Sequence, residues 1–158
     1  MSTGEKQREI NVNEVFHLWN HLVQRYNIIH LTNYMESFAS DVDLKLILAI
    51  GKKTLSEHVS KLEKEMMSYG IPLPTRPPKQ TNPTNNIEAI TDRFIFRRVL
   101  RGIQNFLPTH LMAYIHSTSP DIRELFLSFL IQELKLYDKF IEYGKIKSYE
   151  VKPPAYKR

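Results

Sequence analysis

The fold of this chain is decided by the stretch Ile71-Pro-Leu-Pro-Thr-Arg-Pro-Pro-Lys-Gln-Thr-Asn-Pro-Thr-Asn-Asn86. Its prolines fix the backbone and remove hydrogen-bond donors, so the stretch cannot continue a helix or join a sheet. A polyproline-like path of about sixteen residues can reach roughly 50 Å, at ~3.1 Å per residue. A helix of about 27 residues is roughly 40 Å long. The stretch can therefore run the full length of a helical bundle.

The sequences on both sides of this stretch have the periodicity of helices. Apolar residues recur every three or four positions, and glycine and proline are scarce outside a few short segments. We predict four helices over residues 13–39, 41–69, 87–117 and 119–143. A crossover spans residues 71–86, and a C-terminal tail spans residues 144–158. A length of 158 residues and a hydrophobic fraction of 42% fit a single domain, residues 1–158, with a substantial core.

The links between the predicted helices determine their directions. The links near Ser40 and Thr118 are tight, and tight links join antiparallel neighbours. The long link 71–86 lets the second and third helices run parallel. The prediction is an all-α fold, a single four-helix bundle with up-down-down-up topology, which is the long-crossover arrangement of ferritin-like bundles.

Residues at the ends of these segments are typical of helix ends. Asn13, Asp41 and Ser119 can each accept a hydrogen bond from a free N–H group of the following turn. Gly70, with a proline two residues later, is a stop signal for the second helix. Pro108 falls inside the third helix, where we expect it to bend the helix or interrupt its hydrogen bonding.

A stripe of mostly apolar and aromatic residues predicts the buried face of the first helix. It consists of Val12, Val15, Trp19, Leu22, Val23, Tyr26, His30 and Tyr34. At ~100° per residue, Glu14 and His17 point away from this stripe. His17 and His21 are four residues apart and, with Glu14, could chelate a metal at the surface. We expect instead that both histidines are solvated.

Several short motifs occur in a characteristic order: Leu18-Trp19, Gly70-Ile-Pro-Leu-Pro74, Thr91-Asp-Arg-Phe-Ile-Phe96, Asp121-Ile-Arg-Glu-Leu-Phe126 and Pro153-Pro154-Ala155-Tyr156. Together they resemble an uncharacterised ferritin-like family of spore-forming bacteria, a domain of unknown function that includes proteins named "putative spore coat protein". The resemblance covers nearly the whole chain after about residue 12. It implies a ferritin-like fold and a sporulation-linked context, with the protein in the cytoplasm or assembled onto the spore. It implies no reaction.

A ferritin-like di-metal site needs a carboxylate from each of two helices and a Glu-x-x-His pair from each of the other two. The only such pair in the sequence is Glu14 with His17, on the face predicted to be outside. We therefore expect no standard di-iron site.

A smaller set of polar residues remains on or beside the predicted core faces: His30, His58, His110 and Glu133. At a rise of ~1.5 Å per residue, His58 lies within about 3 Å of Glu133 along the bundle axis, His30 within about 6 Å, and His110 roughly 9 Å away. One interpretation is a mononuclear site for iron, manganese or zinc. The interpretation we favour is a buried hydrogen-bonded layer, because a buried carboxylate must find partners in any case. The resemblance implies similar residues at His58 and Glu133.

The remaining features favour a structural or interaction protein over an enzyme. The chain has no cysteine, no Gly-rich phosphate loop and no nucleophile motif. Its formal charge of +5 is spread through the sequence, which favours a solvated surface over nucleic-acid binding. A basic patch of Arg97, Arg98 and Arg101 could bind phosphate or an acidic partner, but a solvated face is again the expectation.

We expect protein partners or self-association, and no membrane, because no apolar run is long enough to span one. A homodimer could form through apolar residues that lie off the main stripes: Ile28, Leu31 and Met35 of the first helix, with Leu46 and Ile50 of the second. The hypothesis is a non-enzymatic structural or interaction protein associated with the spore coat or sporulation. The alternative is a metal-binding bundle with a degenerate or mononuclear site.

Overall fold

The computed structural model describes residues 9–77 and 90–155 of the chain. Within these residues lie four helices and no strand: α1 (Val12–Glu36), α2 (Val42–Ser68), α3 (Asp92–His116) and α4 (Pro120–Lys147). The predicted all-α class with four helices is confirmed. None of the helices in these two ranges is long and apolar enough to cross a membrane.

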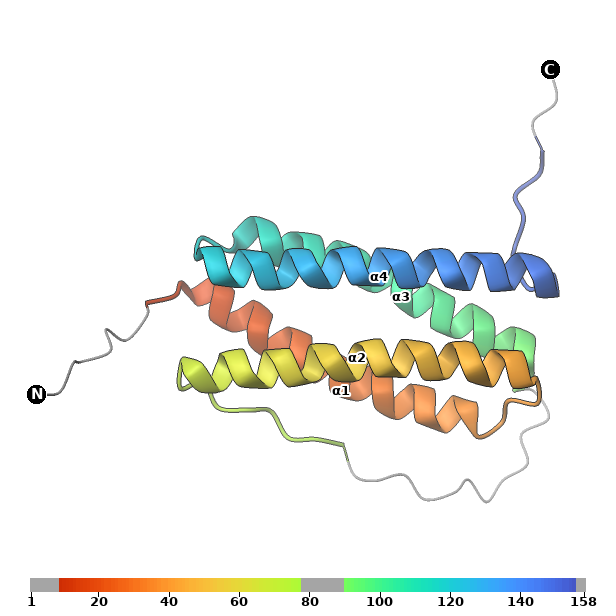
Figure 1. Cartoon of the computed structure of the whole chain (residues 1–158), viewed down its shortest axis with the longest axis horizontal. Helices are drawn as coiled ribbons and strands as arrows, with labels where there is room; N and C mark the ends of the chain where they lie inside the picture. The colour runs from red at the N-terminus through yellow and green to blue at the C-terminus, as the bar shows by residue number, and fades with distance from the viewer. Residues whose placement is uncertain (1–8, 78–89, 156–158) are drawn as a thin grey trace, which may run out of the picture.

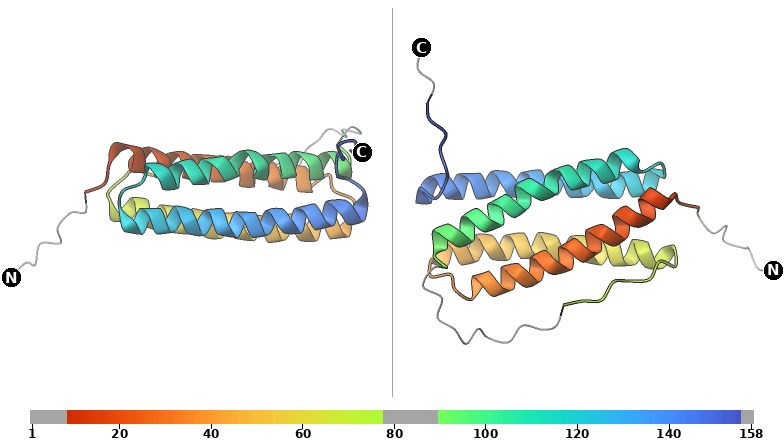
Figure 2. Two further views of the ribbon diagram at one scale, coloured as in Figure 1. Left: turned by 90° about the horizontal axis from the view of Figure 1, so that it is seen from above. Right: turned by 180° about the vertical axis from the view of Figure 1, so that it is seen from behind.

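The four helices form a bundle of two helical hairpins (Figure 1). α1 and α2 are antiparallel across the link 37–41, and α3 and α4 are antiparallel across the link 117–119. α1 and α4 run in one direction and α2 and α3 in the other, so α2 ends and α3 begins at opposite ends of the bundle. α1 packs on α2 and α3, and α4 packs on α3 and α2 (Figure 2). Of the predicted crossover 71–86, the part beyond Pro77 lies outside the described residues.

The start of α1 is fixed by a capping box. The Asn11 side chain accepts a hydrogen bond from the N–H of Glu14 (2.8 Å), and the Glu14 carboxylate accepts one from the N–H of Asn11 (2.9 Å). The predicted cap, Asn13, is wrong because the residue three positions later is Phe16, which cannot complete the box. α1 also ends earlier than predicted, at Glu36 rather than at residue 39.

The other helices begin at side chains that suit a cap. Asp41 precedes α2 and accepts a hydrogen bond from the N–H of Asp43 (3.0 Å), as predicted. Ser119 precedes α4 at the predicted position, but its hydroxyl makes no capping hydrogen bond and instead donates to Glu14 (3.1 Å). α3 begins at Asp92 rather than at residue 87, because the hydroxyl of Thr91 accepts a hydrogen bond from the N–H of the first turn. The predicted helical residues 87–89 lie outside the described part of the chain.

Two left-handed residues mark the ends of α2 and α4. Gly70, with φ 67°, follows α2 at the predicted stop. α4 continues to Lys147, four residues beyond its predicted end at 143, and Ser148 with φ 56° ends it. The predicted tail 144–158 therefore starts later. α3 is helical on both sides of Pro108 and is not interrupted there.

Each hairpin link is bonded to an acidic residue in the first turn of the other hairpin. Glu14 of α1 accepts hydrogen bonds from the backbone N–H groups of residues 118–119, at 2.7 and 2.6 Å. Asp92 of α3 accepts hydrogen bonds from the backbone N–H groups of residues 40–41, at 2.7 and 3.0 Å. The two carboxylates therefore join the hairpins at opposite ends of the bundle.

Two apolar clusters fill the interior, one toward each end. The cluster nearer the α1–α2 link includes Leu48, Phe96 and Phe140, and the cluster nearer the α3–α4 link includes Leu62 and Phe126. Between the clusters, each helix contributes one buried polar or charged side chain to a central group that we call the polar layer: Arg25, His58, His110 and Glu133.

The buried face of α1 differs from the predicted stripe. Trp19 is 44% exposed and Val12 is 86% exposed, whereas Glu14, His17 and His21 are buried. The prediction failed because polar residues occupy much of the buried face, so the apolar residues alone marked a face that is rotated toward solvent. The expectation that His17 and His21 are solvated is wrong for the same reason.

Gly144 of α4 lies directly against the buried ring of Phe96. A Cβ atom at this position would lie 2.4 Å from the Phe96 Cζ atom, so Gly144→Ala forces the ring or the helix to move. We expect a net loss of about 1–2 kcal/mol in the free energy of unfolding, measured by urea titration, because overpacking outweighs the better helix propensity of alanine.

Gly51→Ala is the matched control for this variant. Its Cβ atom would meet the Phe140 ring at 3.7 Å, which is ordinary van der Waals contact. We expect Gly51→Ala to be neutral or stabilising by up to ~1 kcal/mol, since alanine favours a helix. Equal stabilities of the two variants would contradict the packing argument.

Candidate functional site

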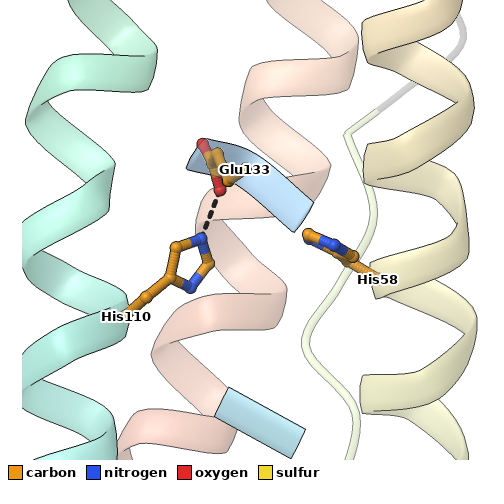
Figure 3. Close-up of side chains that lie close together, drawn as sticks. All are labelled: His58, His110 and Glu133. Carbon is orange, nitrogen blue, oxygen red and sulfur yellow. Dashed lines mark hydrogen bonds and ion pairs between the residues drawn. The ribbon is translucent and has the colours of Figure 1, made fainter. Parts of the chain in front are cut away.

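His58, His110 and Glu133 meet at the centre of the bundle (Figure 3). They come from α2, α3 and α4, each is at most 2% exposed, and one ligand atom from each lies within 4.8 Å of the others. His30, the fourth candidate from the sequence, is half-buried on α1 and does not belong to this group. The structure therefore brings together three of the four candidates.

His110 contacts Glu133 directly, although its axial position predicts a separation of roughly 9 Å. The prediction treated the helices as parallel rods and each side chain as a point beside its Cα atom. α3 is visibly inclined relative to α4 (Figure 1), so the two helices are not parallel rods. Helix side chains also lean along the axis toward the N-terminus, and because α3 and α4 are antiparallel, the imidazole and the carboxylate lean toward each other.

Arg25 of α1 completes the polar layer. Its Nη2 group donates hydrogen bonds to Glu133 and to the Nε2 atom of His110, the latter at 2.6 Å. Its guanidinium carbon lies 4.1 Å from the centre of the Phe106 ring, a cation–π contact. Its side chain is 1% exposed and that of Glu133 is 2% exposed. The layer therefore contains an ion pair that is shielded from solvent.

A chain of histidines connects the layer to one end of the bundle. His21 Nε2 lies 3.1 Å from His110 Nδ1, and His21 Nδ1 lies 2.8 Å from the carbonyl oxygen of His17. The His17 ring shares a 3.0 Å hydrogen bond with His116, which is half-buried. Four histidine side chains thus follow one another from Glu133 toward the α3–α4 link.

The hydrogen bonds determine where the protons of the inner rings lie. A carbonyl oxygen can only accept, so a neutral His21 carries its proton on Nδ1 and presents a lone pair at Nε2. His110 then donates from Nδ1 and keeps a lone pair at Nε2, which accepts from Arg25. The Nε2 lone pair of a neutral His110 thus faces the Oε2 atom of Glu133, so the donor that joins these two acceptors is the Nη2 group of Arg25, which contacts both.

The pKa shifts favour the same protonation states. Burial lowers the pKa of His21 well below its usual value, and it lowers the pKa of His110 despite the opposing effect of Glu133. Burial, aided by the charge of Arg25, lowers the pKa of His58 to about 3. Burial raises the pKa of Glu133, but its interactions with His110 and Arg25 outweigh this and lower the pKa to about 2. At neutral pH the layer therefore carries one positive and one negative charge.

The three candidate ligands suit iron, manganese or zinc in their chemistry but not in their arrangement. Two imidazoles and a carboxylate are donors that these ions accept. His58 donates from Nε2 to the side-chain oxygen of Gln132 (2.7 Å), and its Nδ1 atom has no hydrogen-bond partner within the described ranges. However, the Nη2 group of Arg25 contacts both His110 and Glu133, which places a fixed positive charge between the donors. The residues do not fit a metal ion while Arg25 holds this position.

The whole sequence, residues 1–158, matches the model of a family described as "Protein of unknown function (DUF3231)". The chain belongs to the DUF3231 family. No curated protein sequence matches it.

Solved structures share the fold of this DUF3231 protein. A "putative spore coat protein" from Bacillus halodurans C-125 matches with a TM-score of 0.90 and 21% identity, over 96% of this chain and 98% of its own. A conserved hypothetical protein from Mycobacterium tuberculosis matches with a TM-score of 0.69 and 12% identity, over 83% of this chain and 96% of its own. A DUF305 fragment from Deinococcus radiodurans matches with a TM-score of 0.71 and 13% identity, over 88% of this chain and 99% of its own. At these identities the likeness establishes a common fold.

A prediction based on apolar residues alone misses Arg25, which α1 contributes to the polar layer of this DUF3231 protein. The signal is nevertheless in the sequence: Glu14, His17, His21 and Arg25 are spaced three and four residues apart, which places them on one helix face. An apolar stripe that includes Leu18 and Leu22 lies beside them and is also buried. The inward face of α1 therefore consists of this apolar stripe and a neighbouring row of polar residues.

Proposed function

We propose that this DUF3231 protein is a non-enzymatic structural or interaction protein of the spore, built on a ferritin-like bundle of up-down-down-up topology. The observation that carries the proposal is the position of Arg25 among the candidate ligands. Its guanidinium contacts the carboxylate of Glu133 and the free nitrogen of His110, the atoms that a metal ion would need.

A guanidinium can balance the central carboxylate but cannot replace a metal ion in catalysis. It remains protonated in proteins and only donates hydrogen bonds, so it offers no coordination position to a substrate. Its contacts join α1 to α3 and α4, and an axial slip of α1 by one turn of about 5.4 Å would separate all of them. The polar layer is therefore suited to holding the helices in register, as a buried hydrogen-bonded network does.

An interaction role is supported by the outer face of α2. Val42, Leu46 and Ile50 are spaced four residues apart, which places them on one face, and all three are exposed. Exposed apolar residues that gather on one face are typical of surfaces that bind another protein or a second copy of the chain. Met35, which the sequence assigns to the same surface, is buried in the core and is excluded from it.

The spore context is supported by the structural likeness to the Bacillus halodurans protein, which covers nearly all of both chains. That protein carries the name "putative spore coat protein". The family itself is described only as one of unknown function, so the context rests on this relative and on the sequence resemblance.

The proposal is tested by producing the tagged chain in a sporulating bacterium grown with added iron, manganese and zinc. We expect the chain in the extract of the spore coat, and elemental analysis of the purified protein should find far less than one equivalent of these metals. Recovery only from the mother-cell cytoplasm would contradict the spore assignment. One equivalent of metal in the wild-type protein would contradict the structural role of the polar layer.

A mononuclear metal site is the second candidate function. It is favoured by the Nδ1 atom of His58, a buried lone pair without a hydrogen-bond partner in the described part of the chain. In this case Arg25 would have to leave the ligand group. The same elemental analysis separates the two candidates, because a metal bound through the layer is lost in the variants His58→Gln and Glu133→Gln and is retained in His30→Gln.

A further inference from the structure

A pocket of about 190 Å³ lies between the polar layer and the end of the bundle that holds the α1–α2 link. All four helices contribute to it. Its walls are mainly apolar and include Leu48, Ile103 and Phe140, while Arg25 and Glu133 border it on the side of the polar layer. A pocket with apolar walls at the centre of a bundle is a typical place for a small ligand.

The mouth of the pocket is positively charged. It lies between α1 and α3, which are the two front helices in the right-hand view of Figure 2, and Leu31, Arg98 and Arg101 are exposed there. Lys52, which also lines the pocket, is paired with Glu36. The side chain of neither arginine has a hydrogen bond or an ion pair with any described residue. The mouth therefore carries two positive charges that no carboxylate of the described residues balances.

Gly102 lines this pocket at a position where glycine lowers helix stability. It lies in the middle of α3, where its φ is not in the left-handed region and any residue would fit the backbone. A glycine at such a position destabilises a helix by ~1 kcal/mol relative to alanine. A Cβ atom at Gly102 would meet no atom within 4 Å, so close packing does not require glycine there. Gly102 therefore borders free space beside α3 that a larger side chain would occupy.

We infer that the pocket binds a small carboxylic acid with an apolar tail. The tail lies against the apolar walls, and the carboxylate lies at the mouth between Arg98 and Arg101, whose guanidinium groups donate paired hydrogen bonds to such a group. The acid does not bind Arg25 at the inner end, because the charge of Arg25 is already balanced by Glu133. The pocket is somewhat larger than a cavity of ~150 Å³ that holds benzene, so the tail has roughly six to eight carbons.

Octanoate is the probe that tests this inference, in a calorimetric titration of the full chain below the concentration at which octanoate forms micelles. We expect saturable binding of one octanoate per chain. Octylamine has the same number of carbon atoms and a positive head, and we expect no measurable binding, because the mouth repels it. Absence of octanoate binding, or equal binding of octylamine, would overturn the inference.

Three variants locate the site. Gly102→Leu places a side chain in the pocket and should abolish octanoate binding, while the chain stays folded because leucine favours a helix. Arg98→Gln combined with Arg101→Gln should weaken binding about tenfold through the loss of charge-assisted hydrogen bonds. Arg123→Gln removes an exposed charge of α4 outside the pocket and should leave affinity unchanged. Unchanged binding by Gly102→Leu would overturn the inference, because octanoate would then be bound elsewhere.

Discussion

Glu133→Gln is expected to destabilise the protein by about 3–5 kcal/mol in the free energy of unfolding, measured by urea titration at neutral pH. The substitution preserves the size of the side chain and removes the charge that balances Arg25. The Arg25 side chain is 1% exposed, so water cannot replace the lost partner. Arginine also cannot escape by giving up its proton, since it stays charged in proteins. The cost of an unpaired buried charge therefore appears as lost stability.

Two further variants separate this effect from the loss of an ordinary ion pair. Glu36→Gln breaks the pair with Lys52, where both side chains are partly exposed, and should cost less than about 1 kcal/mol. Arg25→Leu combined with Glu133→Leu removes both buried charges and should recover most of the loss, because an intact buried pair contributes little in total. If Glu133→Gln cost no more than Glu36→Gln, Glu133 would not be the partner that holds Arg25.

Lowering the pH from 7.5 to 5.5 is expected to destabilise the protein by ~3 kcal/mol through His21 and His58 alone, and the lowered pKa values of His17 and His110 add to this loss. His21 and His58 are neutral in the folded state, because burial lowers their pKa values, to about 3 for His58. In the unfolded chain both regain a pKa of 6.5. Below that pH the unfolded state binds more protons, and each histidine then contributes a loss of ~1.4 kcal/mol per pH unit. The free energy of unfolding begins to fall near pH 6.5, the pKa of these histidines in the unfolded chain. It continues to fall as the pH approaches their lower pKa values in the folded state.

Carboxylates do not explain a loss of stability in this pH range. The pKa of Glu133 is lowered from 4.5 to about 2 in the fold, so its stabilising effect is complete above 4.5 and is lost only below that value. His58→Gln can still donate to Gln132 but cannot titrate, so it should reduce the loss of stability between pH 7.5 and 5.5 by ~1.4 kcal/mol. Urea titrations at both pH values measure this. A stability that stays constant or rises on acidification would contradict the assignment of neutral histidines.

The helical hairpins could be predicted because their signals are local. Asp41 caps α2 and Gly70 ends it through interactions among residues that are close in the sequence, and Pro120 in the first turn of α4 is an equally local signal. The end of α4 could not be predicted in this way. Gly144 remains helical although glycine often ends a helix, and its lack of a Cβ atom leaves room for the ring of Phe96 on another helix.

The centre of the bundle was predictable only in part. His58 and Glu133 could be identified as candidates because each lies beside or within an apolar stripe, where a polar residue is unexpected. The contact of His110 with Glu133 depends on how α3 and α4 pack, and the place of Arg25 depends on which face of α1 turns inward. The spacing of Arg25 with His17 and His21 places all three on one face of α1, but spacing alone does not show that this face is buried, so both contacts required the structure.

The bonds from Glu14 and Asp92 to the hairpin links have a consequence for how the chain folds. Neither hairpin satisfies all the backbone N–H groups of its own link, since residues 118–119 and 40–41 donate to a carboxylate of the other hairpin. A hairpin formed alone would leave these donors to water and would expose its half of the core. Neither half is therefore a complete folding unit, and the two hairpins are expected to form and melt together in one cooperative transition.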